Sequence, residues 1–271
     1  MKTKMLQAVV LTLLGCVAWQ AQAGTVIQQV ERAIGNSQSR QQVTIYLDAG
    51  KLRVEGENPR SGKYLVIFDN AKQVLWMADL PNGSYMEITK AQVEAMGGQM
   101  QQMMQQMQAQ LAQIPPEQRA MVEQMMRQQM GGMGGNAPPP VTVREKNRGE
   151  TVGPFTCTRY EVLTGGQVTE EICAAAPSQL RLDASAVATF KALAEFFEPL
   201  RRMAPQGSWS APKAMDQIDG FPVQTVVYEG QRPASEWVIV KAEEQSLDAG
   251  LFALPGNLKK TEMPQMPPTQ R

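Results

Sequence analysis

Few residues in this chain have the types and spacing that enzyme chemistry needs. Its 271 residues include no histidine, which excludes a Ser-His-Asp triad, a Cys-His pair and an HExxH zinc site. Ser210 and Lys213 have the S-x-x-K spacing of a Ser-Lys nucleophile, but Pro212 disfavours the helix that this motif requires. Glu170-Glu171 and Glu243-Glu244 fall in strand-like runs, where neighbouring side chains point to opposite faces. We therefore expect a protein that is not an enzyme.

Methionine is the other residue type with possible chemistry here. Residues 96–133 contain 10 of the 18 methionines and 12 glutamines. Met100, Met103, Met104 and Met107 recur with the period of one helix face. Thioethers bind Cu(I) and Ag(I), but copper sites usually add His or Cys, and neither is near. A packing stripe or an adaptable binding surface explains the spacing equally well. We expect no metal or cofactor, with soft-metal binding as the alternative.

Two cysteines, Cys157 and Cys173, predict a disulfide in an exported chain. They lie in strand-like runs on either side of Gly165-Gly166, a hairpin signal. A three-residue loop, 164–166, would place Cys157 directly opposite Cys173 and Arg159 opposite Glu171. The other face of the hairpin would then face the core.

The first residues read as an export signal. Lys2 and Lys4 precede an apolar run, 5–18, and an A-x-A site that ends at Ala23. This pattern predicts a signal peptide cleaved between Ala23 and Gly24, and hence a periplasmic or secreted protein. The alternative is a lipoprotein, because the residues before Cys16 resemble a lipobox, in which this cysteine would be lipidated. No later run is apolar for long enough to span a membrane, and 26 basic against 26 acidic residues disfavour nucleic-acid binding.

The remaining chain predicts about eleven strands and three long helices in one α+β domain. Residues 25–88 predict a meander of strands, in which the runs 64–68 and 74–77 are apolar on both faces. Both faces of the sheet must then be covered by other parts of the chain, and helices later in the sequence are the candidates. Residues 96–133 predict a helical hairpin. Asp183 or Ser185 would cap a helix that runs to about Arg202, with Pro199 kinking or fraying its last turn. A final hairpin joins 221–229 to 236–243.

The boundaries that follow from these patterns divide the chain into five parts. They are a signal peptide, 1–23; a β meander, 24–95; a Met/Gln-rich helical hairpin with a Gly/Pro linker, 96–140; further strands with one long helix, 141–260; and a disordered tail, 261–271.

Several segments resemble an exported bacterial family of unknown function related to the lipoprotein-carrier (LolA-like) half-barrels. They are Tyr46–Val54, Phe68-Asp69 with Val74–Trp76, Ser84–Glu87, Asp219–Val223 and Leu251–Pro255. The resemblance implies a curved antiparallel sheet, an open half-barrel, with helices against its concave face. In the carriers this hollow is apolar and receives acyl chains. The Met/Gln-rich segment is not part of the resemblance.

These observations lead to a functional hypothesis. We expect a non-enzymatic periplasmic protein that binds an apolar ligand, a lipid or a lipid-modified partner in a half-barrel hollow. The hollow would be flanked by Trp76, Tyr85, Phe190, Phe197 and the methionines Met100, Met103, Met104 and Met107. The alternatives are soft-metal binding through the Met-rich helices, and a structural or protein-interaction module of the cell envelope.

Overall fold

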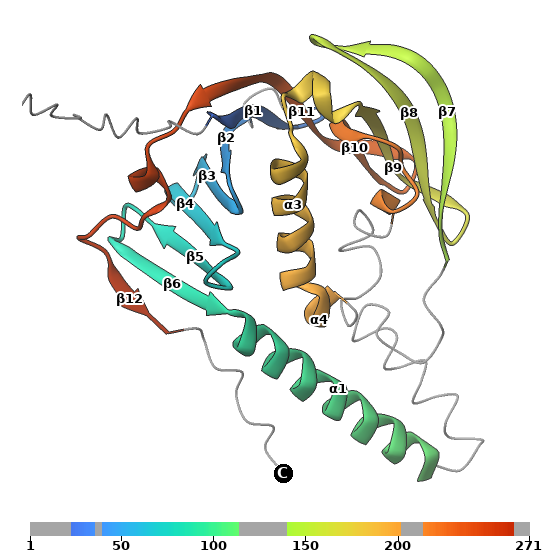
Figure 1. The fold of residues 1–271 in the computed structure, drawn as a ribbon. Helices are drawn as coiled ribbons and strands as arrows, with labels where there is room; N and C mark the ends of the chain where they lie inside the picture. Colours follow the sequence, from blue (N-terminus) through green and yellow to red (C-terminus); the bar gives the residue numbers. More distant parts are fainter. Residues whose placement is uncertain (1–22, 36–39, 114–139, 202–213, 263–271) are drawn as a thin grey trace, which may run out of the picture.

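The protein is built on one long curved sheet. The computed structural model describes residues 23–35, 40–113, 140–201 and 214–262. Within them, twelve strands form a single open sheet in the order β12-β6-β5-β4-β3-β2-β1-β11-β10-β9-β8-β7. The sheet bends around helix α3, and its two ends do not join into a barrel (Figure 1). The fold is therefore mostly sheet with a few helices.

The bounds of the elements are as follows. The strands are β1 (Ala23–Ala33), β2 (Arg40–Asp48), β3 (Lys51–Asn58), β4 (Gly62–Asp69), β5 (Val74–Asp79), β6 (Ser84–Thr89), β7 (Val141–Val152), β8 (Phe155–Thr164), β9 (Gln167–Ala175), β10 (Phe221–Glu229), β11 (Arg232–Ser246) and β12 (Lys259–Thr261). The helices are α1 (Lys90–Gln113), α3 (Ala184–Phe196) and α4 (Glu198–Arg201), with the 3-10 turns η1 (Pro177–Leu180) and η2 (Ala249–Phe252).

The predicted meander is present, and strands β1 to β6 pair in sequence order. Both faces of the doubly apolar strands β4 and β5 are covered, but only one cover is helical. Phe68 and Leu75 belong to the main core with Phe196 of α3. On the opposite face, Leu65, Ile67 and Ala78 pack against Leu254 and Leu258. The second cover is therefore the segment that follows η2, which the sequence patterns did not assign to this role.

Helix α3 begins and ends for local reasons. The Asp183 side chain accepts a hydrogen bond from the Ala186 amide at 2.7 Å, so Asp183, one of the two predicted candidates, is the N-cap. The helix breaks after Phe196, because Pro199 has no amide hydrogen to donate to the carbonyl of Glu195. That carbonyl instead accepts a hydrogen bond from Lys90 Nζ at 2.6 Å. Lys90 thus connects the start of α1 to the end of α3.

The hairpin of β8 and β9 contains the predicted disulfide, Cys157–Cys173, but in a different register. The turn has two residues, so Thr164 pairs with Gln167, and a bulge between Val162 and Leu163 shifts the rest. Cys157 then pairs with Ala175, and Cys173 with Arg159. The two cysteines are diagonal neighbours on one face, with their Cα atoms 5.5 Å apart. Expecting them directly opposite was wrong, because glycine in two successive positive-φ positions closes a tighter turn.

Both faces of this hairpin are buried, which also differs from expectation. Cys157 and Cys173 belong to the main core. Tyr160, Val162 and Ile172 form a second cluster with Ala214 and Ile218. The hairpin is therefore an interior part of the sheet rather than a half-exposed flap.

Three further strands have bounds or partners that the sequence patterns did not indicate. The last hairpin closes more tightly than expected, since Glu229 pairs with Arg232 and β11 starts there. Strand β7 continues through a polar run to Val152 because it pairs with β8. Strand β12, which no sequence pattern indicated, lies parallel to β6. Ala23, the last residue of the predicted signal peptide, begins β1, and Thr261, in the tail predicted to be disordered, ends β12. The described residues do not include the rest of the predicted signal peptide with Cys16, the second helix of the Met/Gln hairpin, Ser210, Lys213 and the tail beyond residue 262.

Candidate functional site

The aromatic residues predicted to flank one hollow lie on two faces of the sheet. Trp76 and Tyr85 pack with Leu65 and Ile67, on the face covered by the segment after η2. Phe190 and Phe197 pack in the main core with α3, on the other face. These four residues therefore do not line a common hollow, because alternate positions of β5 and β6 point to opposite sides.

Trp76 is fixed by polar contacts on its own face. Its indole Nε1 donates to Glu87 Oε2 at 2.9 Å, and Lys72 Nζ lies 5.4 Å from the ring centroid. Lys260 of β12 donates to Glu87 Oε1 at 2.6 Å. The hydrogen bonds from Lys260 and then Trp76 lower the pKa of the Glu87 carboxyl. These contacts explain Trp76 as a residue that ties β12 to β5 and β6.

A row of apolar side chains crosses the α3 side of the sheet. It contains one residue from each of the strands β2 to β6, each directly opposite the next: Ile45, Val54, Val66, Met77 and Met86. We call this set the apolar row. Ile45, Val54 and Val66 pack against the main core but are only half-buried, and Met77 is 41% exposed. The α3 side of β2 to β6 therefore presents apolar surface that the described helices do not fully cover.

The residues of α3 and α4 that face the sheet are largely aromatic, and those near the end of α3 are only half-buried. Phe196 is 1% exposed and its ring centroid lies 5.5 Å from that of Phe68 on β4. Phe190 contacts Phe221 of β10 at 4.9 Å between centroids. Further along, Leu193, Phe197 and Leu200 are half-buried against the main core. Two of the four predicted aromatic residues, Phe190 and Phe197, thus lie on the same side of the sheet as the apolar row.

The methionine helix α1 docks by its first turns. Val93 is fully buried, and a side chain at Gly97 would meet Pro199 Cβ at 2.9 Å, so α1 and α4 touch closely there. Beyond this contact Met100 is half-buried and Met103 is 53% exposed. The side chains of Met104 and Met107 lie outside the described part of the structure. Figure 1 shows α1 extending away from the end of β6 and past α4.

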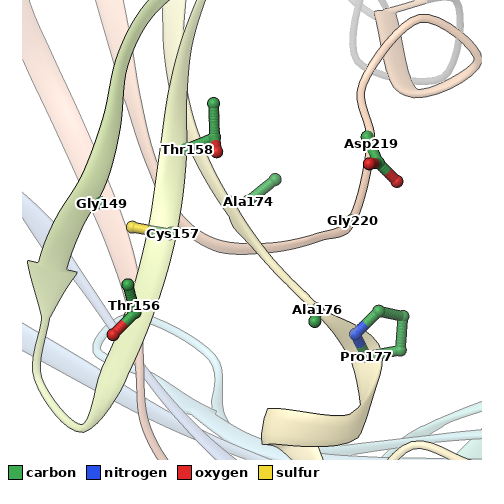
Figure 2. Close-up of a pocket in the computed structure, with 9 residues that line it drawn as sticks. All are labelled: Gly149, Thr156, Cys157, Thr158, Ala174, Ala176, Pro177, Asp219 and Gly220. Atoms are coloured by element: carbon green, nitrogen blue, oxygen red, sulfur yellow. The ribbon is translucent and has the colours of Figure 1, made fainter.

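A small polar cleft lies near the start of β8 (Figure 2). It has a volume of about 300 Å³, and its lining residues are Gly149, Thr156, Cys157, Thr158, Ala174, Ala176, Pro177, Asp219 and Gly220. Gly220 has a φ of 114°, and a Cβ there would lie 2.7 Å from the Ala175 carbonyl oxygen. Thr156 and Thr158 both belong to β8, whereas Asp219 lies in the segment before β10 (Figure 2). The sequence patterns singled out Asp219–Val223 but gave no sign of the two threonines.

A larger cavity, of about 650 Å³, lies where β1 ends and β2 begins. We call it the arginine pocket; it is lined by Arg32, Ala33, Ile34, Gly35, Arg40, Val226 and Glu236. Sequence reasoning missed it entirely. Five of its seven residues lie between positions 32 and 40. Val226 and Glu236 join them because β1 pairs with β11, which in turn pairs with β10.

Comparison with known proteins places the chain in a family. Residues 89–258, more than half of the sequence, match the model of a domain of unknown function, DUF4412. The chain belongs to the DUF4412 family. No curated protein matches the sequence. A solved structure of PNGF-II matches with a TM-score of 0.38 and 7% sequence identity, over 89% of this chain and 32% of that one. The chain therefore spans about a third of the length of that structure.

The DUF4412 match divides the candidate sites. The polar cleft lies wholly within the matched residues, whereas the apolar row lies in the strands before residue 89. The arginine pocket combines β1 and β2, before the match, with β10 and β11, inside it.

None of the described helices is long and apolar enough to cross a bilayer. Within the described ranges, His, Cys, Asp and Glu form no group of three that could hold a metal ion.

Proposed function

We propose that this protein is a non-enzymatic protein of the cell envelope that binds an apolar ligand, a lipid or a lipid-modified partner on the α3 side of strands β2 to β6. The proposed binding surface differs from the hollow expected from the sequence. It consists of the apolar row with Phe197 and Leu200, and it does not include Trp76 and Tyr85, which lie on the other face of the sheet. The Cys157–Cys173 disulfide is consistent with an extracellular or periplasmic location. The resemblance to lipoprotein-carrier half-barrels supports the same class of ligand.

The apolar row is the observation that carries the proposal. A side chain that serves only the core is normally buried, and a contiguous apolar surface left open often marks a binding site. Ile27 of β1, which is directly opposite Ile45, is fully buried. Within the row, Ile45, Val54, Val66 and Met86 are half-buried, and Met77 at 41% is the most exposed, so the row is open at its β5–β6 end. Methionine at the open end suits a surface that must adapt to flexible hydrocarbon chains.

The first experiment is native mass spectrometry of the freshly purified protein, followed by lipid extraction. Copurified lipid or another apolar molecule supports the proposal. A protein that is empty and also fails to bind a neutral apolar dye, such as N-phenylnaphthylamine, contradicts it.

A pair of variants locates the binding surface. Met77→Gln makes the open end of the apolar row polar, and the loss of roughly 1 kcal/mol of apolar contact should weaken dye binding about fivefold. Leu80→Gln is the matched control, since Leu80 is 37% exposed but follows the end of β5. Equal effects of the two substitutions would mean that the row is not the site.

The methionine spacing of α1 and the exposure of Met103 favour a second candidate, soft-metal binding. Met100 and Met103 lie almost one turn apart, and Met103 is the most exposed of the large apolar side chains among the described residues. Titration with Cu(I) of the full chain and of a variant without residues 99–130 tests this candidate. Equal copper uptake by the two proteins would exclude it, and would leave α1 to the third hypothesis, a surface for a protein partner.

A further inference from the structure

The arginine pocket joins two like charges across neighbouring strands. Arg32 of β1 and Arg40 of β2 are directly opposite each other. Such a pairing of like charges destabilises a sheet unless something compensates it. Arg32 is compensated by Glu236 of β11, its direct neighbour on the other side. Arg40 forms no ion pair with any residue that the structure describes.

The guanidinium of Arg32 binds a buried carboxylate, although the Arg32 side chain itself is 60% exposed. Its Nε and Nη2 both contact Glu236 Oε2 at 2.5 Å, which leaves Nη1 outside this ion pair. Glu236 is itself buried and accepts a hydrogen bond on Oε1 from Gln224. Gln224 in turn accepts one from Arg159 Nη2 at 2.9 Å. A charged group anchored by such a chain of contacts is preorganised, which is the usual requirement for a recognition site.

The rest of the pocket wall is apolar. Ile34 is 42% exposed although its backbone amide is fixed by a 2.8 Å hydrogen bond to the Ala234 carbonyl. Val226 of β10 is directly opposite Glu236 and is half-buried. The cavity of about 650 Å³ falls within the usual range of small-molecule sites. It thus combines an excess of positive charge, two arginines against one carboxylate, with an exposed apolar wall.

We propose that the arginine pocket binds a small amphiphilic anion, a carboxylate or a phosphate on a short hydrocarbon chain. Arg40 binds the anionic group together with Nη1 of Arg32, and Ile34 and Val226 contact the hydrocarbon. Guanidinium groups suit this role because their planar donors match carboxylate and phosphate oxygens. The proposal does not depend on the function proposed for the apolar row, because the two surfaces share no residue.

Isothermal titration of the full chain with four probes tests the proposal. Octanoate and octyl phosphate carry the two possible anionic groups, octanol lacks the charge, and inorganic phosphate lacks the chain. We expect one saturable site for at least one of the two amphiphilic anions. Octanol and inorganic phosphate should each bind at least about tenfold more weakly, because each keeps only half of the contacts. The stronger of the two anions identifies the preferred group.

Two variants assign the site. Arg40→Gln should weaken binding of the anion at least about tenfold, and Ile34→Ser should remove most of the advantage of octyl phosphate over inorganic phosphate. Arg60→Gln, in the exposed turn between β3 and β4, is the matched control and should change nothing. Binding that survives Arg40→Gln, as it would on the apolar row, overturns the proposal. So does the absence of saturable binding by either amphiphilic anion.

Discussion

Reduction of the Cys157–Cys173 disulfide should destabilise the protein by an amount that can be calculated from its position. The two cysteines are 16 residues apart in sequence. In the loop-entropy model, a crosslink that closes a loop of this length stabilises the folded state by about 3 kcal/mol, because it restricts the unfolded chain. For a domain of this size, about 3 kcal/mol corresponds to a fall in Tm of roughly 6–12 °C.

The assay is urea unfolding with and without dithiothreitol, together with thermal unfolding under both conditions. The double variant Cys157→Ala/Cys173→Ala is the control for the reductant, because its unfolding should not respond to dithiothreitol. Both cysteines are buried in the main core, 3% and 0% exposed. The double variant should therefore have a lower free energy of unfolding than the reduced wild type, because it lacks the packing of the two buried sulfur atoms. Reduced and oxidised wild-type proteins that unfold within about 0.5 kcal/mol of each other would refute the loop-entropy reasoning.

Three further predictions concern other contacts. Lys90→Met should lower the free energy of unfolding by about 1–2 kcal/mol, because the carbonyl of Glu195 loses a charged hydrogen-bond donor. Urea unfolding measures this loss, and Lys90→Arg, which keeps a charged donor, should show a smaller one. Gly220→Ala should cost at least about 2 kcal/mol, since φ is 114° and the new Cβ would lie 2.7 Å from a backbone oxygen of β9; no fall in Tm would contradict this. The hydrogen bond from Arg144 lowers the pKa of the Glu161 carboxyl in the folded protein. The stabilisation by this ion pair is therefore complete above the pKa that Glu161 has in the unfolded chain, and it is lost as the pH falls below about 4.5. Glu161→Gln should therefore flatten the dependence of the urea midpoint on pH between about 5 and 3.

The features that the sequence predicted well are local. Asp183 caps α3 because an aspartate before an apolar helical stripe can bond the first free amides. The break after Phe196 follows from Pro199, which cannot donate to the carbonyl four residues earlier. The disulfide was predictable because both cysteines fall on one face of a short hairpin. In each case the determining residues lie within about twenty positions of one another.

The candidate sites were less predictable because they depend on which face of the sheet each strand presents. In β5, Trp76 and Met77 are neighbours in the chain, yet one lies under the segment after η2 and the other on the apolar row. Sequence alternation separates the two faces, but it does not say which one receives a helix when both are apolar. For this reason the sequence could not show that Trp76 and Tyr85 lie on one face of the sheet and Phe190 and Phe197 on the other.

The sequence by itself thus determined the strand meander, the cap and break of α3, and the pairing of the two cysteines. Only the tertiary structure decided the register of the β8–β9 hairpin, the second cover of the sheet and the composition of the arginine pocket. That pocket shows the physical reason most clearly: Arg32 and Glu236 are 204 positions apart. They meet because β11 returns to pair with β1, and no local pattern of residues encodes a contact across that distance.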